Sequence, residues 1–167
     1  MQINVAQLLK EGTGATRSYE LEEGLALEDI GECQIRGVVE LLRTKIGVLV
    51  RGTFATTCSL TCSRCLTTLE YPLHFSMTEE FLPTVDIKTG VVLDQSEDPC
   101  AFLVDDHHIL DLGEAVRQYA TLALPMKPLC KPDCAGLCPQ CGANLNLRTC
   151  TCKPPYHGLQ IPESGHS

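Results

Sequence analysis

The sequence has no tryptophan and few other aromatic residues, which together make up 5% of its 167 positions. Proteins that bind single-stranded nucleic acid commonly hold the bases by stacking them on aromatic side chains. The scarcity of such side chains argues against a base-stacking RNA module. Hydrophobic residues still reach 44% of the chain, so we expect a packed core.

The sequence also lacks an apolar run of the roughly 18 residues that a membrane-spanning helix needs. Its first residues, Met1 to Val5, carry no basic leader, and Lys10-Glu11 interrupts the apolar stretch early. An export signal is therefore not expected. We expect a cytoplasmic protein, in a compartment where thiols are kept reduced.

Cysteine, by contrast, is abundant, with 11 residues in the chain. An odd number of cysteines cannot all pair as disulfides, and a reducing compartment disfavours such pairs. Metal ligation is therefore the preferred interpretation of the cysteine content.

The net charge of −8 is distributed unevenly. Residues 65–114 carry one basic and eleven acidic side chains, whereas residues 33–64 and 115–162 each carry five basic and one acidic. The basic side chains could offset the negative charge of a zinc ion bound by four thiolates, or they could contact phosphates. We favour the first explanation, because a protein that is acidic overall gains little from bulk attraction to nucleic acid.

The hydrophobic pattern predicts an α+β fold. Residues 33–57 alternate as a pair of strands, although Gly47 and Gly52 blur the register, and residues 71–77 alternate again. A helix is expected at about 111–124, with Asp111 and Glu114 as a capping box and Pro125 ending it. The predicted architecture is a small antiparallel sheet or partial barrel packed by one main helix, followed by a C-terminal cysteine-rich, zinc-ribbon-like hairpin.

These elements predict three parts of the chain. Residues 1–129 form a β-rich core that includes the helix. Residues 130–152 form a cysteine-rich zinc-binding appendage, and residues 153–167, with two adjacent prolines, form a flexible tail.

The strongest local signal is Cys138-Pro139-Gln140-Cys141-Gly142. Two thiolates three residues apart on a tight turn can bind one cation, and Gly142 supplies the positive φ that lets the chain turn away. The sequence holds three further pairs: Cys62 with Cys65, Cys130 with Cys134, and Cys150 with Cys152.

These eight cysteines predict one or two structural zinc sites with four cysteine ligands each. The simplest arrangement joins Cys62 and Cys65 to Cys130 and Cys134, and leaves a local set of Cys138, Cys141, Cys150 and Cys152. An alternative places Cys134, Cys138, Cys141 and Cys152 on one ion, and Cys58 could replace a member of the first set. A site closed by four cysteines has no open coordination position, so it builds structure and does not activate water.

Other polar and thiol residues allow different interpretations. Cys33 and Cys100 are expected to be small buried hydrophobic residues. The run Asp105-Asp106-His107-His108 could form an open metal site of a hydrolase. Neighbouring residues of an extended segment point to opposite faces, however, so a solvated acidic loop is the simpler interpretation.

The ordered set of motifs resembles the YceD family of large ribosomal RNA subunit accumulation proteins. The resemblance rests on Cys62-Ser63-Arg64-Cys65-Leu66, Glu79-Glu80-Phe81, Asp111-Leu112-Gly113-Glu114 with Leu124-Pro125, and the run from Gly136 to Asn146, and it extends over about residues 30–152. It implies a role in the synthesis, processing or stability of 23S ribosomal RNA. Some members of the family look as if they lack the distal cysteine cluster, which supports Cys62, Cys65, Cys130 and Cys134 as one unit.

Taken together, the sequence predicts a non-enzymatic factor in large ribosomal subunit biogenesis. Its partner would be large-subunit ribosomal RNA or a basic large-subunit ribosomal protein, and neither a membrane nor a small-molecule substrate is expected. A zinc-stapled adaptor for protein interactions, without a direct role toward ribosomal RNA, is the alternative, and a metal-dependent hydrolase is a further one. A direct contact with RNA would use five basic residues, Arg36, Arg43, Lys45, Arg51 and Arg64.

Overall fold

The computed structural model describes residues 1–28, 30–93 and 100–152, and the chain divides into two compact units. The first, the sheet unit, comprises Met1–Ser59 and Glu70–Pro125. The second, the cysteine unit, joins Leu60–Leu69 to Met126–Ser167. The sequence predicted boundaries after residues 129 and 152, whereas the two compact units divide after Pro125, and the tip of an internal hairpin, Leu60–Leu69, also belongs to the cysteine unit. The predicted tail, residues 153–167, lies outside the described residues.

Seven strands and two helices make up the regular structure of the described residues. In chain order they are β1 (Gln2–Asn4), α1 (Ala6–Lys10), β2 (Thr16–Leu27), β3 (Gly31–Arg43), β4 (Val48–Thr61), β5 (Thr68–Pro83), β6 (Phe102–Val104), β7 (Ile109–Asp111) and α2 (Gly113–Ala123).

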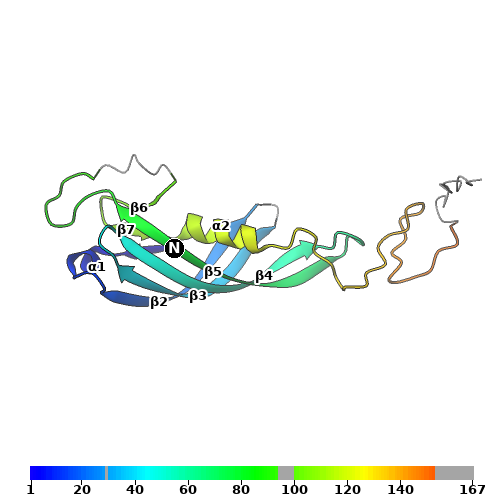
Figure 1. The fold of residues 1–167 in the computed structure, drawn as a ribbon. Helices are drawn as coiled ribbons and strands as arrows, with labels where there is room; N and C mark the ends of the chain where they lie inside the picture. The colour runs from blue at the N-terminus through cyan, green and yellow to red at the C-terminus, as the bar shows by residue number, and fades with distance from the viewer. Residues whose placement is uncertain (29, 94–99, 153–167) are drawn as a thin grey trace, which may run out of the picture. The chain divides into compact units, whose positions relative to one another are not determined.

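The seven strands form one sheet in the order β1-β7-β6-β5-β4-β3-β2 (Figure 1). Strand β2 pairs antiparallel with β3, and β3 pairs antiparallel with β4, as sequential strands joined by short turns can. Strand β6 instead pairs parallel to β5, with Phe81 opposite Phe102. The sheet is therefore mixed and not purely antiparallel as the alternation suggested.

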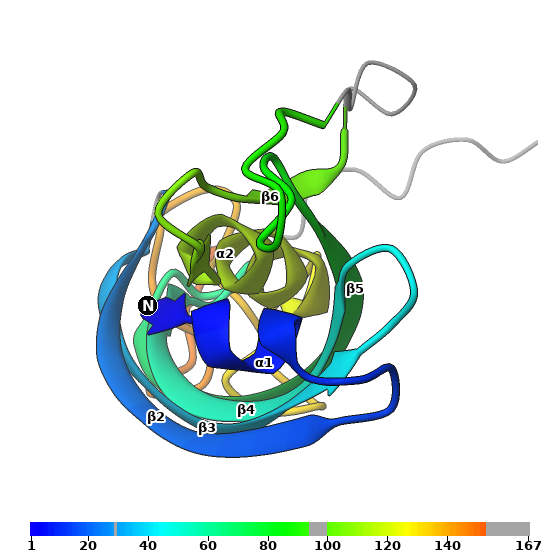
Figure 2. The same cartoon turned by 90° about the vertical axis from the view of Figure 1, so that its left-hand side faces the viewer.

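The sheet curls around both helices, so that its concave side encloses the core of the sheet unit (Figure 2). Alternate residues of each long strand point inward, and Val39, Leu41 and Val50 are fully buried there. The helix α2 turns its small side chains, including Ala115 and Ala120, toward this core. The half-barrel and its cysteine-rich C-terminal segment agree with the predicted fold class at this coarse level.

Two glycines of the central strands make room for an aromatic ring. A Cβ atom at Gly37 would lie 2.4 Å from the ring of Phe54, and one at Gly52 would lie 2.5 Å from it. The same ring stacks on Phe75, with 5.2 Å between the ring centroids. The Phe54 ring thus occupies the space that a side chain at Gly52 would need. This is why a glycine interrupts the alternation of the strand at this position.

The helices differ from the prediction in number and in capping. The expectation of one main helix missed α1, whose Leu8 and Leu9 are buried but whose five residues are too few to show a helical period. The expected capping box at α2 is found only in part, because Oδ1 of Asp111 accepts the N–H of Gly113 over 2.8 Å but Glu114 pairs with Arg117. The predicted end is confirmed, since Leu124 is extended.

Two further features were not foreseen. Strand β2 was not assigned because its Glu20, Glu22 and Glu23 interrupt any apolar alternation, as is common at the edge of a sheet. Cys100 is exposed, so its prediction as a buried hydrophobic residue is wrong, whereas Cys33 is buried as expected. Neither helix among the described residues has the length and apolar character needed to cross a membrane.

Candidate metal centre

The first cysteine cluster joins the turn between β4 and β5 to the chain after α2. The Sγ atoms of its four members all lie within 4.8 Å of one another, and the cluster consists of Cys62, Cys65, Cys130 and Cys134. The Sγ atoms of Cys62 and Cys134 are 3.8 Å apart, and those of Cys65 and Cys130 are 3.5 Å apart. Cys62, Cys65 and Cys134 are buried, and the partly buried leucines 69, 129 and 137 pack against them.

Backbone hydrogen bonds shape the turn that carries the first two thiols. The N–H of Cys62 donates to the carbonyl of Thr67 over 2.9 Å, and the N–H of Leu66 donates back to the carbonyl of Cys62 over 3.0 Å. Leu66 takes a φ of 57°, which closes the turn. The N–H of Cys65, together with that of Arg64, lowers the pKa of the Cys62 thiol from 9.0 to about 6.

Arg64 fixes the loop that carries the fourth thiol. Its Nη1 donates to the carbonyl of Cys134 over 2.9 Å, and its own carbonyl accepts the N–H of Leu137 over 3.2 Å. Gly136 passes close by with a φ of 75°, and a Cβ there would lie 3.2 Å from the Arg64 carbonyl oxygen. The Arg64 side chain, which was predicted to contact phosphate, therefore has a structural role within the cysteine unit.

The second cluster repeats the same turn chemistry. Its sulfur atoms also lie within 4.8 Å of one another, and its members are Cys138, Cys141, Cys150 and Cys152. Gly142 takes the expected positive φ of 68°. The N–H groups of Cys141 and Gln140 lower the pKa of the Cys138 thiol to about 6.

Both clusters fit a tetrahedral zinc ion. Zinc–sulfur bonds of about 2.3 Å place the sulfurs of a tetrahedral site roughly 3.8 Å apart, and the sulfurs here lie at comparable separations. Four thiols surround each centre, so a bound ion would have no open position for water or substrate. The first member of each Cys-x-x-Cys turn is already stabilised as a thiolate, the form that binds metal.

The eight sulfurs lie in two sets of four, with the same members as in the simplest arrangement considered from the sequence. Cys58, considered as a substitute ligand, belongs instead to the sheet unit. It lies opposite Cys33, with 3.0 Å between the two Sγ atoms, and both side chains are buried. Burial, and then the hydrogen bond with Cys33, raise the pKa of Cys58 to about 12, so the Cys58 thiol stays protonated near neutral pH.

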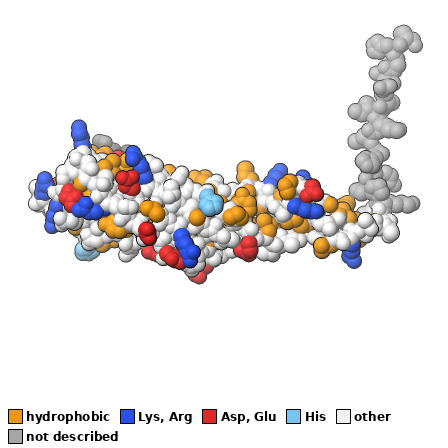
Figure 3. Space-filling model, turned by 90° about the horizontal axis from the view of Figure 1, so that it is seen from below, with side chains coloured by type: hydrophobic (Ala, Val, Ile, Leu, Met, Phe, Trp, Pro, Cys, Tyr) orange, Lys and Arg blue, Asp and Glu red, His pale blue; other side chains and the backbone are white. Residues whose placement is uncertain are grey.

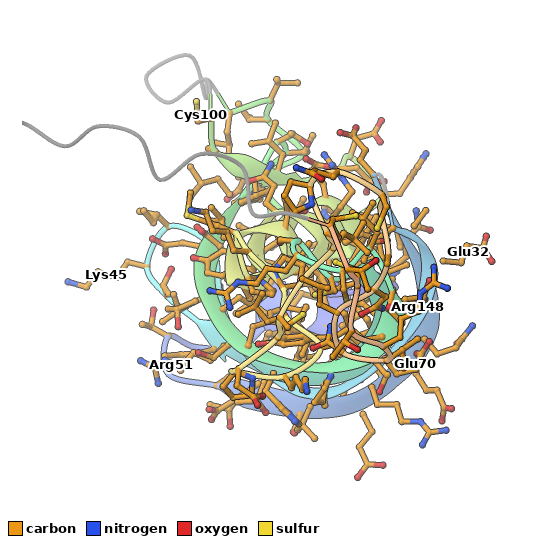
Figure 4. The ribbon with its side chains drawn as sticks, turned by 90° about the vertical axis from the view of Figure 1, so that its right-hand side faces the viewer. Glu32, Lys45, Arg51, Glu70, Cys100 and Arg148 are labelled. Atoms are coloured by element: carbon orange, nitrogen blue, oxygen red, sulfur yellow. The ribbon has the colours of Figure 1, made fainter. Side chains whose placement is uncertain are left out.

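Four of the five basic residues predicted to contact RNA lie in the sheet unit, and two of these four make hydrogen bonds within the protein. Arg36 donates to Glu22 over 2.8 Å, and Arg43 donates to the backbone carbonyls of Thr44 and Gly47. Lys45 and Arg51 are exposed, and Figure 4 shows them pointing away from the curled sheet.

The acidic and histidine run before β7 forms a tight turn. Oδ1 of Asp105 accepts the N–H groups of His107 and Ile109 over 2.9 and 2.7 Å. His108 takes a φ of 61°, and its Nδ1 is buried without a hydrogen-bond partner. Among the described residues, the candidate metal clusters contain cysteine only, so the structure does not gather these side chains around one point.

Comparison with protein families identifies the chain. The family model described as large ribosomal RNA subunit accumulation protein YceD matches residues 50–160, more than half of the sequence, and this range contains both clusters. The chain belongs to the YceD family. The resemblance inferred from the sequence motifs is thereby confirmed.

Individual relatives agree with this membership. An uncharacterized protein of Mycobacterium tuberculosis is 38% identical over 99 residues, which cover 59% of this chain and 45% of the relative. A Mycobacterium leprae relative is 30% identical over 98 residues, or 59% of this chain and 43% of its own. The chloroplastic large ribosomal RNA subunit accumulation protein YCED homolog 1 of Zea mays is 44% identical over 46 residues, 27% of this chain and 16% of the plant protein.

The chain therefore spans less than half the length of the mycobacterial relatives. No solved structure matches it.

Proposed function

We propose that this YceD-family protein is a non-enzymatic factor in large ribosomal subunit biogenesis that supports the synthesis, processing or stability of 23S ribosomal RNA. The observation that carries the proposal is the family match over residues 50–160, because it includes both cysteine clusters and the turn between β4 and β5. The names of the family and of its plant relatives connect them to ribosomal RNA accumulation.

In this proposal both clusters bind structural zinc. The eight thiols would hold the ions, which would cross-link the segments of the cysteine unit, and backbone N–H groups stabilise Cys62 and Cys138 as the thiolates that bind metal. Because each centre is closed by four sulfurs, it can order the cysteine unit but offers no site for a substrate. A binding factor requires only such an ordered surface.

A basic ribosomal protein fits the sheet unit better than the RNA backbone does. Of the predicted phosphate-binding residues in this unit, Arg36 and Arg43 are already occupied by intramolecular contacts. On the face shown in Figure 3, Lys and Arg side chains are interspersed with Asp and Glu, so no broad basic surface appears there. The excess of acidic residues over 65–114 suits a cationic partner, which opposite charge would attract.

One observation favours the second candidate, a zinc-stapled adaptor for protein interactions. The cysteine unit exposes several large apolar side chains, with exposed fractions of 64% for Leu66, 99% for Met126 and 83% for Leu147. Exposed apolar residues held on a rigid scaffold are typical of protein-binding surfaces. Such a surface would serve an adaptor whether or not its partner belongs to the ribosome.

Depletion followed by complementation tests these candidates together. Loss of the protein should lower 23S relative to 16S ribosomal RNA and reduce free 50S particles, and the wild-type gene should restore both. The Cys62→Ser/Cys65→Ser variant should fail to restore them, whereas His107→Ala/His108→Ala should succeed. If His107→Ala/His108→Ala failed to restore the 23S level and the 50S particles, the result would favour the hydrolase.

Normal 23S levels and normal 50S profiles after depletion would refute the ribosomal role. The adaptor would then remain, and its partner would be sought by affinity capture with protein and RNA identified from the same sample.

A further inference from the structure

A chain of polar side chains links the two cysteine clusters inside the cysteine unit. Asn146 lies between Cys141 and Cys150 in the sequence, on the hairpin of the second cluster, yet its Nδ2 donates to the Sγ of Cys134 in the first cluster over 3.3 Å. Its Oδ1 accepts the N–H of Ala135 over 2.9 Å. One amide side chain thus holds both the sulfur and the adjacent backbone of a first-cluster residue.

A second asparagine continues the link to another thiol of the first cluster. Oδ1 of Asn144 accepts both the backbone N–H and the Nδ2–H of Asn146, over 3.0 and 2.9 Å. Nδ2 of Asn144 donates to Oγ1 of Thr67 over 3.4 Å. Thr67 Oγ1 is in turn 3.3 Å from the Sγ of Cys65, and this contact lowers the pKa of the Cys65 thiol.

The backbone of the second hairpin is attached to the same place. Leu137 and Asn144 form an antiparallel bridge, and the N–H of Leu145 donates to the carbonyl of Gly136 over 2.9 Å. Cys138 lies directly after this bridge and donates its N–H to the carbonyl of Ala143 over 2.8 Å. Ordering the second cluster therefore also orders the segment that carries the two asparagines.

We propose that Asn146 is a positioning residue shared by the two clusters, so that metal binding at either cluster strengthens metal binding at the other. The inference rests on the proposed zinc sites and goes beyond them, because two closed sites need not interact. Metal at the second cluster fixes the hairpin, and the fixed hairpin presents the Nδ2–H of Asn146 to the Cys134 thiolate. Coupling between two binding sites is reciprocal, so metal at the first cluster favours the same hairpin geometry.

The expected size of the effect follows from other metal sites. Removing a hydrogen bond that orients a metal ligand typically lowers metal affinity about 10–100-fold. We compare the product of the two zinc association constants in the wild-type chain with the product of the two constants measured separately in variants that keep only one cluster. The wild-type product should be larger by about 10–100-fold. No local pattern in the sequence predicts this link, because the proximity of Asn146 to Cys134 arises only in the folded cysteine unit.

The test is a thermodynamic cycle on the full-length chain. Zinc affinity is measured by competition with a chromophoric chelator in the wild type, in Cys138→Ser/Cys141→Ser, which keeps only the first cluster, and in Cys62→Ser/Cys65→Ser, which keeps only the second. The same set is then measured with Asn146→Asp, which can still accept the Ala135 N–H but cannot donate to sulfur. Met126→Glu is the matched control, since it adds the same charge at a fully exposed position of the same unit, outside both clusters.

The excess affinity should be present in the wild type and in Met126→Glu, and should be absent with Asn146→Asp. With cobalt in place of zinc, Asn146→Asp should also shift the sulfur-to-cobalt charge-transfer band of the first cluster, because a hydrogen bond to sulfur is lost. Two zinc ions bound with independent affinities would overturn this inference and leave the zinc sites intact. A chain that binds no zinc at either cluster would overturn both.

Discussion

Removal of zinc is expected to unfold the cysteine unit and to leave the strands of the sheet unit folded. The described segment Met126–Cys152 contains no helix or strand, and the unit's buried cluster consists of three cysteines with three partly buried leucines around it. So small an apolar core cannot offset the entropy of ordering this chain. Structural zinc sites of this kind contribute about 10 kcal/mol or more to folding.

Elemental analysis together with hydrogen exchange measures this result. The purified chain should hold two zinc ions, and a strong chelator should abolish amide protection over 126–152 while β3 and β4 keep theirs. Cys62→Ser should retain one ion when zinc is in excess. Cys100→Ser is the matched control, because Cys100 lies outside both clusters, and it should retain two. Full protection of 126–152 in metal-free, reduced protein would refute the zinc scaffold.

Replacing Phe81 with alanine should produce the largest loss of stability of any single alanine substitution among the described side chains of the sheet unit. Among the described residues its side chain is the largest that is fully buried, and its ring stacks on Phe102 with 5.3 Å between the centroids. It also lies on β5 opposite β6, where the parallel pair connects the long strands to β7 and β1. Truncating such a ring typically costs about 3–5 kcal/mol, because a cavity remains where the ring was.

Urea unfolding monitored by the β-sheet circular dichroism signal measures the change in the free energy of unfolding. Phe102→Ala is the informative control, since it removes the other ring of the same stack from a partly exposed position and should cost clearly less. Equal losses for the two variants would show that the stacking contact, and not the burial of Phe81, determines the stability of this part of the sheet.

Much of the candidate site could be predicted because its signals are local. In Cys-x-x-Cys, two thiols lie on one turn whatever the rest of the chain does, and Gly142 marks the positive φ that such a turn needs. The end of α2 was equally local, since Pro125 forces Leu124 out of the helical region. The ordered motifs were also sufficient to indicate the family.

Features of the sheet that depend on long-range pairing were harder to predict. The alternation of β3, β4 and β5 indicated inward and outward faces, but the parallel pairing of Phe81 with Phe102 joins residues that no local pattern relates. Strand β2 is charged because it lies at the edge of the sheet, and that position exists only after the sheet has formed. The exposure of Cys100 likewise depends on the surroundings that the fold provides.

By itself, the sequence determined which residues can hold metal, where the chain turns and which strands alternate, because each of these depends on neighbours a few positions away. Only the tertiary structure decided that Cys62 and Cys65 meet Cys130 and Cys134, that Arg64 secures a loop, and that Asn146 reaches from one cluster to the other. These contacts join residues about 12 to 72 positions apart, whose proximity depends on the closure of long loops by the folded chain.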